Sequence, residues 1–157
     1  MAKFTERIRG IASYIDAGES VADIGSDHGY LPIWLARAGV SPRVILTDIA
    51  KGPLAIARAN AGSYGLTDCR LGDGLAPLAP GEVDVVVVAG MGGETIIDIL
   101  GANLTKTASF AKFILQPRTK ADLLRSWLSE RYEIVAEDTV RERGRPCPII
   151  VVSTSAA

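Results

Sequence analysis

Residues 21–32 read VADIGSDHGYLP and carry the strongest structural signal in this chain of 157 residues. An apolar run leads into a turn with two glycines and two carboxylates, and a helical pattern follows. This order predicts a strand, a ligand-binding loop at its carboxyl end, and then a helix. Gly25 and Gly29 allow the backbone to turn tightly and to approach a ligand closely. Asp23 and Asp27 would repel a pyrophosphate, so the loop favours a ligand that carries positive charge.

Outward from this loop, short β-branched runs alternate with longer helical patterns, which is typical of a parallel α/β sheet. The valine-rich run at 83–89 is expected to be a central strand covered by helices on both faces. Two extended segments around the basic turn 141–145 predict an antiparallel hairpin. We therefore predict an α/β, Rossmann-like sheet of the class I methyltransferase kind, with seven mostly parallel strands and a terminal antiparallel hairpin. The expected strands are residues 20–24, 43–47, 68–71, 83–89, 110–116, 132–139 and 148–153, and the expected helices are residues 4–15, 30–38, 53–61, 94–100 and 120–129.

The composition is that of one ordinary globular domain, and we expect residues 1–157 to form it. The formal net charge of −1 gives no global basic field, so a nucleic-acid partner would need a local basic patch. One histidine and two distant cysteines, Cys69 and Cys147, predict no metal site. No signal peptide is visible, and no apolar run approaches the ~20 residues of a membrane span. We therefore expect a cytoplasmic protein with no membrane partner, and the oligomeric state stays open.

Three further strand ends carry residue types that bind ligands. Asp48 follows the second predicted strand, where a carboxylate can accept both ribose hydroxyls of an adenosine. Asp73 lies between two glycines and is expected to accept a hydrogen bond from an adenine amino group, while the glycine-rich loop 90–93 lets a cofactor approach the backbone. Each loop taken alone also reads as an ordinary turn, but together they predict a site for S-adenosylmethionine (SAM), whose sulfonium and amino groups suit the carboxylates. The expected SAM-binding residues are Asp23, Gly25, Ser26, Asp27, Gly29, Asp48, Asp73, Gly74, Ala89, Gly90, Met91 and Gly92.

Four stretches resemble the bacterial tRNA (adenine-22-N1)-methyltransferase family: DIGSDHGYLP at 23–32, RLGDGL at 70–75, AGMGG at 89–93 and LQP at 115–117. The resemblance covers nearly the whole chain. It implies SAM as the methyl donor, a Rossmann-like catalytic domain, and N1 of an adenine in tRNA as the acceptor. The family usually continues with a helical extension, which is lacking after Ala157, so we expect either weaker RNA docking or a shortened relative.

The expected chemistry is a direct displacement at the sulfonium methyl group. N1 of adenine holds a lone pair and no proton, so most of the catalysis would come from proximity and alignment rather than from a strong base. We expect Gln116 to hydrogen-bond the edge of the base. For His28 three roles stay open: to orient the cofactor, to touch the base, or to stabilise the start of a helix. Where this chain has Arg118 the family tends to show asparagine, which implies a changed substrate preference or a phosphate-binding role.

The densest basic segment contains Arg141, Arg143 and Arg145, which would share one side of an extended chain. It is either a phosphate-binding patch, with strongly salt-dependent RNA binding, or a solvated hairpin tip. Two other functions stay open. One is a SAM-dependent methyltransferase with a different or small-molecule acceptor, and the other is a non-catalytic SAM-binding module.

Overall fold

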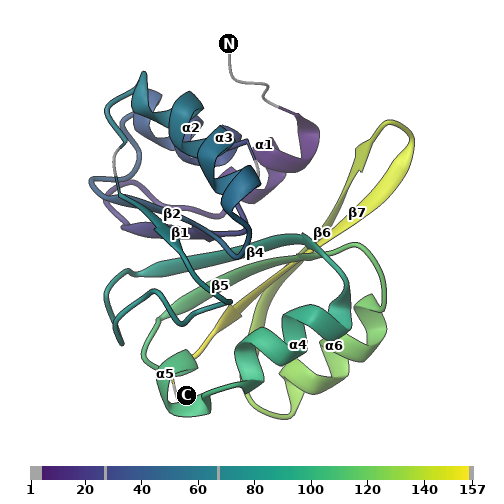
Figure 1. Ribbon diagram of the computed structural model, residues 1–157. Helices are drawn as coiled ribbons and strands as arrows, with labels where there is room; N and C mark the ends of the chain where they lie inside the picture. Colours follow the sequence, from purple (N-terminus) through teal and green to yellow (C-terminus); the bar gives the residue numbers. More distant parts are fainter. Residues whose placement is uncertain (1–4, 27, 67, 156–157) are drawn as a thin grey trace.

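One mixed sheet of seven strands forms the centre of the computed structural model, which describes residues 5–26, 28–66 and 68–155 (Figure 1). Its strands are β1 (Val21–Ile24), β2 (Val44–Asp48), β3 (Cys69–Leu71), β4 (Val85–Met91), β5 (Lys112–Pro117), β6 (Glu133–Glu142) and β7 (Arg145–Ser153). The strand order is β3-β2-β1-β4-β5-β7-β6; the first five strands are parallel, and β7 is antiparallel to β5 and β6. The predicted α/β sheet with a terminal hairpin is confirmed.

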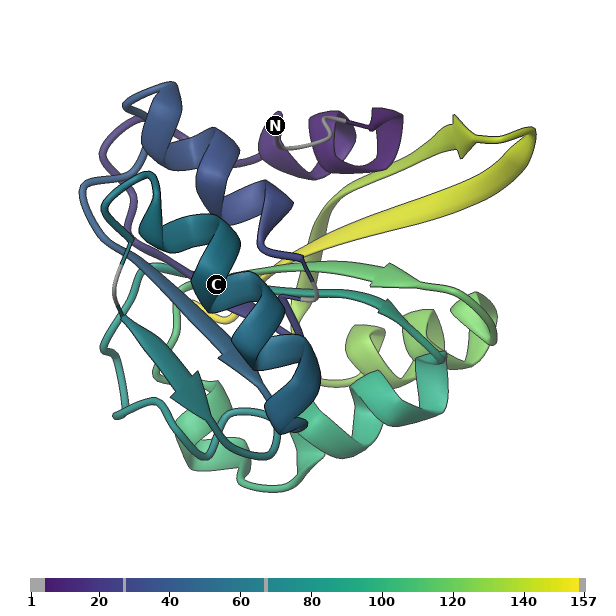
Figure 2. The ribbon, with the colours of Figure 1, turned by 45° about the horizontal axis from the view of Figure 1, so that its top comes forward.

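Helices cover both faces of the sheet (Figures 1 and 2). They are α1 (Glu6–Ala12), α2 (Tyr30–Arg37), α3 (Lys51–Gly62), α4 (Gly93–Gly101), α5 (Leu104–Thr107) and α6 (Ala121–Ser129). α1, α2 and α3 lie on one face, and α4 and α6 lie on the other (Figure 1). Within the described residues, no helix is long and apolar enough to cross a membrane.

The valine run of β4 is the middle of the core, and its side chains alternate between the two faces. Val85 and Val87 belong to the apolar cluster that includes the buried side chains of α1 and α2. Val86 and Val88 belong to the cluster that includes α4 and α6. All four are fully buried, as expected for a central strand with helices on both sides.

Most predicted elements end within two residues of the observed ones; the exceptions are the first helix and the two hairpin strands, and one short helix was not predicted. The first helix ends at Ala12 rather than at residue 15. The four-residue helix α5 was not predicted, because one turn is too short to show a helical period. Both hairpin strands are longer than the predicted 132–139 and 148–153, because exposed charged residues in β6 hide its alternation.

The hairpin of β6 and β7 reaches beyond the carboxyl end of β5. The last pair of β5 with β7 is Leu115–Ile150, whereas β6 and β7 remain paired as far as Glu142–Arg145. Only Arg143 and Gly144 form the turn, with φ of 52° and 75°, as in the tight two-residue turns of hairpins. Arg141, Arg143 and Arg145 therefore lie around the predicted hairpin turn, and they would share one side only if this segment were extended.

Candidate active site

Two cavities meet at the carboxyl ends of the parallel strands, where ligands bind in such sheets. The large cavity, of about 1060 Å³, is lined by the ends of β1, β4 and β5, by α1 and by the hairpin tip. The small cavity, of about 510 Å³, is lined by the ends of β1 and β2, by the loop at 72–74 and by α4. Gly25 and Met91 line both cavities. The two hollows therefore form one site divided at this pair of residues.

Gly25 has no room for a side chain. Its φ is +70°, and a Cβ atom there would lie 2.6 Å from Cε of Met91. The backbone N–H groups of Gly25 and Ser26 both donate to the carbonyl of Thr47 at 3.0 Å, which ties the loop after β1 to the end of β2. The hydroxyl of Ser26 donates to the carbonyl of Asp23, whose side chain is buried. Asp23, Gly25 and Ser26, which the sequence singled out, thus line the large cavity.

The rest of this loop divides between the cavity and the packing of α2. His28 lines the large cavity, where its ring stacks on that of Tyr30 at 5.2 Å between centroids. Gly29 lines neither cavity; it is the N-cap residue that precedes α2, with φ of 77°, and it packs against Leu46. Asp27 lies outside the described residues.

The small cavity contains the acidic residues that the sequence predicted at the second and third strand ends. Asp48 and Asp73 both line it, together with Gly74. Asp48 is buried, and its Oδ1 accepts a hydrogen bond of 3.0 Å from the N–H of Ala50. That bond is the ordinary Asx turn, so Asp48 shapes its loop and also presents its carboxylate to the cavity. Oγ1 of Thr47, at the same strand end, is buried and has no hydrogen-bond partner among the described residues.

The loop after β4 is held by the amide of Gln116. Oε1 of Gln116 accepts from the N–H of Gly90 at 3.2 Å, and its Nε2 donates to the carbonyl of Pro117 at 3.0 Å. Gly90 has φ of 73° at a register shift between β4 and β5, which is a β-bulge of the kind found beside active sites. Each amide atom of Gln116 has one further hydrogen-bonding position, and the residue lines the large cavity beside Ala89, Gly90 and Met91.

Gly92 lines neither cavity and instead is the N-cap residue that precedes α4. The structure therefore gathers most of the predicted set around the two cavities, and it gives Gly29 and Gly92 a place in the helix starts. The predicted role of each residue in binding or catalysis stays a prediction.

Sequence reasoning missed the wall that α1 and the hairpin contribute to the large cavity. Burial alone would raise the pKa of Glu142, but hydrogen bonds from the Thr5 side chain and the Arg7 backbone and the positive charge of Arg7 lower it below its ordinary value. The guanidinium of Arg7 lies 3.5 Å from this carboxylate. Glu142 thus joins the start of α1 to the hairpin, across 135 residues of sequence, and no local pattern reveals such a contact.

The residues that line the two cavities lie within a segment that one family model matches. A family model described as a methyltransferase domain matches residues 4–150, and the chain belongs to that family. The chain is 37% identical over 153 residues to the tRNA (adenine(22)-N(1))-methyltransferase of Bacillus subtilis, which covers 95% of this chain and 64% of that protein. The chain therefore spans just under two thirds of the length of this relative.

Solved structures agree with the family. A crystal structure of a putative tRNA (m1A22) methyltransferase of Streptococcus pneumoniae matches with a TM-score of 0.91 and 37% identity, over 96% of this chain and 70% of that one. A structure of the same protein in complex with S-adenosyl-L-methionine matches with a TM-score of 0.90 and 37% identity, over 98% of this chain and 73% of that one. The predicted Rossmann-like methyltransferase fold is confirmed.

Proposed function

We propose that this chain binds SAM across the two cavities and catalyses methylation of N1 of an adenine in tRNA. The observation that carries the proposal is the division of one site at Gly25 and Met91. A small acidic cavity on one side suits an adenosine, and a larger cavity on the other leaves room for a second base. The similarity to tRNA (adenine-22-N1)-methyltransferases supports this acceptor.

The residues of the small cavity fit the adenosine part of the cofactor. Asp48 offers a buried carboxylate for the two ribose hydroxyls, and the unpartnered Oγ1 of Thr47 adds a polar atom at the same strand end. Asp73 would accept from the adenine amino group. Asp23, buried at the start of the β1 loop, would face the ammonium of the methionine part. Bound SAM supplies the electrophilic methyl group.

The residues of the large cavity position the acceptor rather than activate it. N1 of adenine already has its lone pair, so the chain needs only to hold the base with N1 in line with the sulfonium methyl group and to exclude other orientations of the base. Gln116 fixes the loop at Gly90 and has one free donor position for the base edge. An adenine in folded tRNA must leave its stack to enter, and His28 and Tyr30 offer stacked rings along the cavity wall. A tRNA substrate would also place the reaction in the cytoplasm.

The test is a methylation assay with labelled SAM and unmodified bulk tRNA, followed by digestion to nucleosides. We expect label in 1-methyladenosine. A matched reaction with Asp48→Asn, which keeps the Asx turn but loses the charge, should give much less product. Binding of SAM without labelled RNA would contradict the tRNA acceptor and favour a small-molecule acceptor or a binding module. No binding of SAM would contradict the proposal as a whole.

A further inference from the structure

Three arginines of the large cavity have guanidinium groups without any partner among the described residues. They are Arg118, Arg143 and Arg145, and all three are exposed. Every other arginine contacts a carboxylate, a carbonyl oxygen or an aromatic ring; these are Arg7, Arg9, Arg37, Arg43, Arg58, Arg70, Arg125, Arg131 and Arg141. Among the described residues, the three arginines whose guanidinium contacts no other group therefore all lie at one cavity, although the net charge is −1.

The three arginines come from two segments that the fold brings together. Arg118 directly follows β5, and its backbone N–H donates to the carbonyl of Met91 at 2.7 Å, which fixes it beside the loop that divides the two cavities. Arg143 and Arg145 lie on the hairpin tip, which extends past the last pair of β5 with β7. The overhang of the hairpin thus brings its tip to the cavity that Arg118 also lines.

The hairpin tip is held in place by its own contacts. The guanidinium of Arg141 donates to the carbonyl of Gly144 across the turn at 3.1 Å. The carboxylate of Glu142 lies 3.5 Å from the guanidinium of Arg7, which ties the hairpin to α1. The two neighbouring arginines therefore project from a fixed support, which lowers the entropy lost when they bind.

Arg143 occupies a backbone conformation that suits other residues better. Its φ is +52°, and the first position of such a turn favours asparagine, aspartate or glycine. Arg143 therefore lines the cavity although its backbone conformation is unfavourable for an arginine.

The other charges that line the cavity within the described residues do not neutralise these arginines. Of the two carboxylates among the described lining residues, Glu142 is already engaged by Arg7, and Asp23 is buried. An exposed guanidinium offers two parallel donors that match the oxygens of a phosphate. Several of them around the entrance of one cavity suit a polyanion whose neighbouring phosphates bind together.

We propose that Arg118, Arg143 and Arg145 form an arginine rim that binds phosphates of the RNA backbone next to the nucleotide that enters the large cavity. The inference rests on the proposed function, because it takes the occupant of the cavity to be a base in RNA. It adds where the RNA backbone lies: between the end of β5 and the hairpin tip.

The test measures binding of fluorescently labelled unmodified tRNA to the purified chain as salt is raised from about 50 to about 200 mM. In the triple variant Arg118→Gln, Arg143→Gln, Arg145→Gln, the salt dependence should weaken, with the slope of log K against log salt falling by about 1 for each arginine. The KM for tRNA should rise at least about tenfold, with the affinity for SAM unchanged by calorimetry. The control is Arg37→Gln with Arg58→Gln, on α2 and α3, which removes two positive charges elsewhere on the surface, so the effects are compared per arginine removed.

A second variant separates phosphate binding from folding. Arg143→Asn removes the guanidinium and suits the positive φ, so its Tm should stay the same or rise while its affinity for tRNA falls. A triple variant with the salt slope and KM of the control would overturn the arginine rim and leave the methylation proposal intact. RNA binding that depends on the three arginines but yields no 1-methyladenosine would support the rim and contradict the proposed reaction. No binding of tRNA by the unaltered chain would overturn the rim.

Discussion

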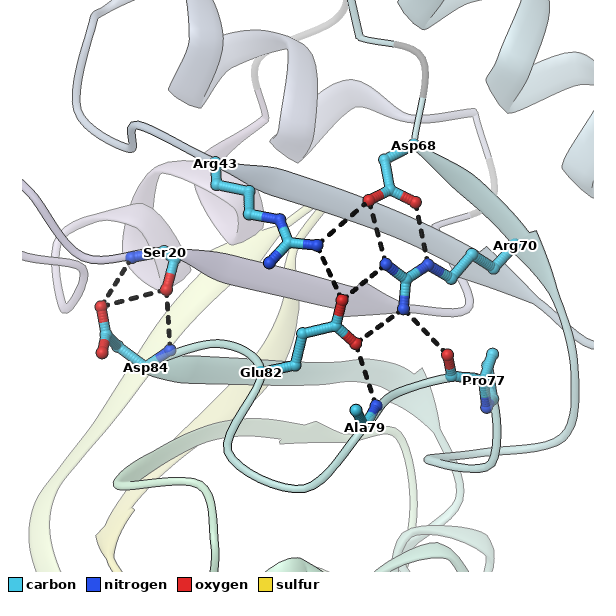
Figure 3. Close-up of polar contacts among 8 residues, drawn as sticks. All are labelled: Ser20, Arg43, Asp68, Arg70, Pro77, Ala79, Glu82 and Asp84. Atoms are coloured by element: carbon cyan, nitrogen blue, oxygen red, sulfur yellow. Dashed lines mark hydrogen bonds and ion pairs between the residues drawn. The ribbon is translucent and has the colours of Figure 1, made fainter.

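The guanidinium of Arg70 in β3 donates two hydrogen bonds to the carboxylate of Glu82, each 2.7 Å long (Figure 3). Arg70 also donates to Asp68 at 2.8 and 3.0 Å, and Arg43 donates to Glu82 at 2.7 Å. The hydrogen bonds from Arg70 to Glu82 raise the pKa of the guanidinium above its ordinary value. These charges connect the segments that precede β2, β3 and β4, at some distance from the predicted ligand loops.

Arg70 nevertheless supports the small cavity through a short chain of contacts. Its Nη1 donates to the carbonyl of Pro77 at 2.9 Å. The Pro77 ring lies so close to Gly72 that a Cβ atom there would be 2.8 Å from the ring. Gly72 in turn donates its N–H to the carbonyl of Asp48 at 2.9 Å, and Asp73 follows it directly. The ion network therefore fixes the loop that lies between the two acidic residues of the cavity.

The first prediction concerns Arg70→Gln. The change leaves Glu82 and Asp68 without their main partner, and we expect a loss of about 2 kcal/mol in the free energy of unfolding. Because the loop at 72–74 loses its support, the Kd for SAM should rise about fivefold. Urea unfolding and calorimetry measure the two effects. Arg37→Gln, which removes an exposed arginine next to Tyr64, is the control; a loss no larger than the control's would contradict the role of the network.

The second prediction is a loss of stability in acid that depends on Glu82. Hydrogen bonds from Arg70 lower the pKa of Glu82 from its ordinary 4.5 to about 2 in the folded chain. Since the folded pKa is the lower one, this stabilisation is fully present above about pH 4.5 and is lost as the pH falls toward 2. The side chain of Arg70 is 25% exposed, so we expect about 2 kcal/mol rather than the full value of the shift.

Urea unfolding at several pH values between about 6 and 3 tests this prediction, because the carboxylate begins to take up a proton in this range. Glu82→Gln should be less stable than the unaltered chain at neutral pH, and the difference should shrink in acid. A difference that stays constant across the range would show that Glu82 does not contribute through its charge.

The third prediction concerns Asp48→Asn. The asparagine Oδ1 can still accept from the N–H of Ala50, so the free energy of unfolding should change by less than about 0.5 kcal/mol. The ribose hydroxyls would lose a charged acceptor, so the affinity for SAM should fall by about ten- to a hundredfold. Calorimetry measures the affinity. Equal affinities for the two chains would mean that Asp48 only shapes its loop.

The strand ends were predictable because local patterns encode them. Asp48 and Asp73 were found from their position after short apolar runs, and the run at 83–89 marked the central strand without any knowledge of its neighbours. The parallel order then places both acidic residues at one edge of the sheet, which is where the small cavity lies.

The large cavity was only half predictable, because α1 and the hairpin tip close it. Their contact depends on Glu142 reaching Thr5 and Arg7, and on Gly10, where a Cβ atom would lie 2.9 Å from Val140 of β6. Such contacts between the two ends of the chain leave no periodic signal. None of the residues of β6 is fully buried, and three consecutive residues in its middle are exposed. Its length could therefore not be inferred from hydrophobic alternation.

The fourth prediction concerns the amide of Gln116, which we expect to position the loop at Gly90. Gln116→Met keeps the length of this buried side chain but removes both hydrogen bonds. The kcat for methylation should fall about tenfold or more, because the loop would no longer hold the acceptor in line. The KM for SAM should change less than kcat, since Gln116 does not line the small cavity, where the adenosine part of SAM is proposed to bind. Steady-state kinetics at saturating tRNA separate the two parameters, and a change confined to the KM for SAM would contradict the assignment.

The last prediction concerns Gly93, the first residue of α4, whose N–H donates to the carbonyl of Thr119 at 2.8 Å. A Cβ atom at Gly93 would lie 2.5 Å from the carbonyl oxygen of Lys120 and 2.8 Å from that of Thr119. These are backbone atoms, so Gly93→Ala has to separate α4 from the segment after β5, at a cost of about 2 kcal/mol.

In the control Gly62→Ala, at the end of α3, nothing lies within 4 Å of the new Cβ atom, and stability should rise by about 0.5 kcal/mol. Thermal unfolding compares the two variants. Because α4 also lines the small cavity through Thr95, Asp98 and Ile99, the affinity of Gly93→Ala for SAM should fall as well. An alanine at 93 that is tolerated as well as one at 62 would mean that α4 does not depend on this close backbone contact.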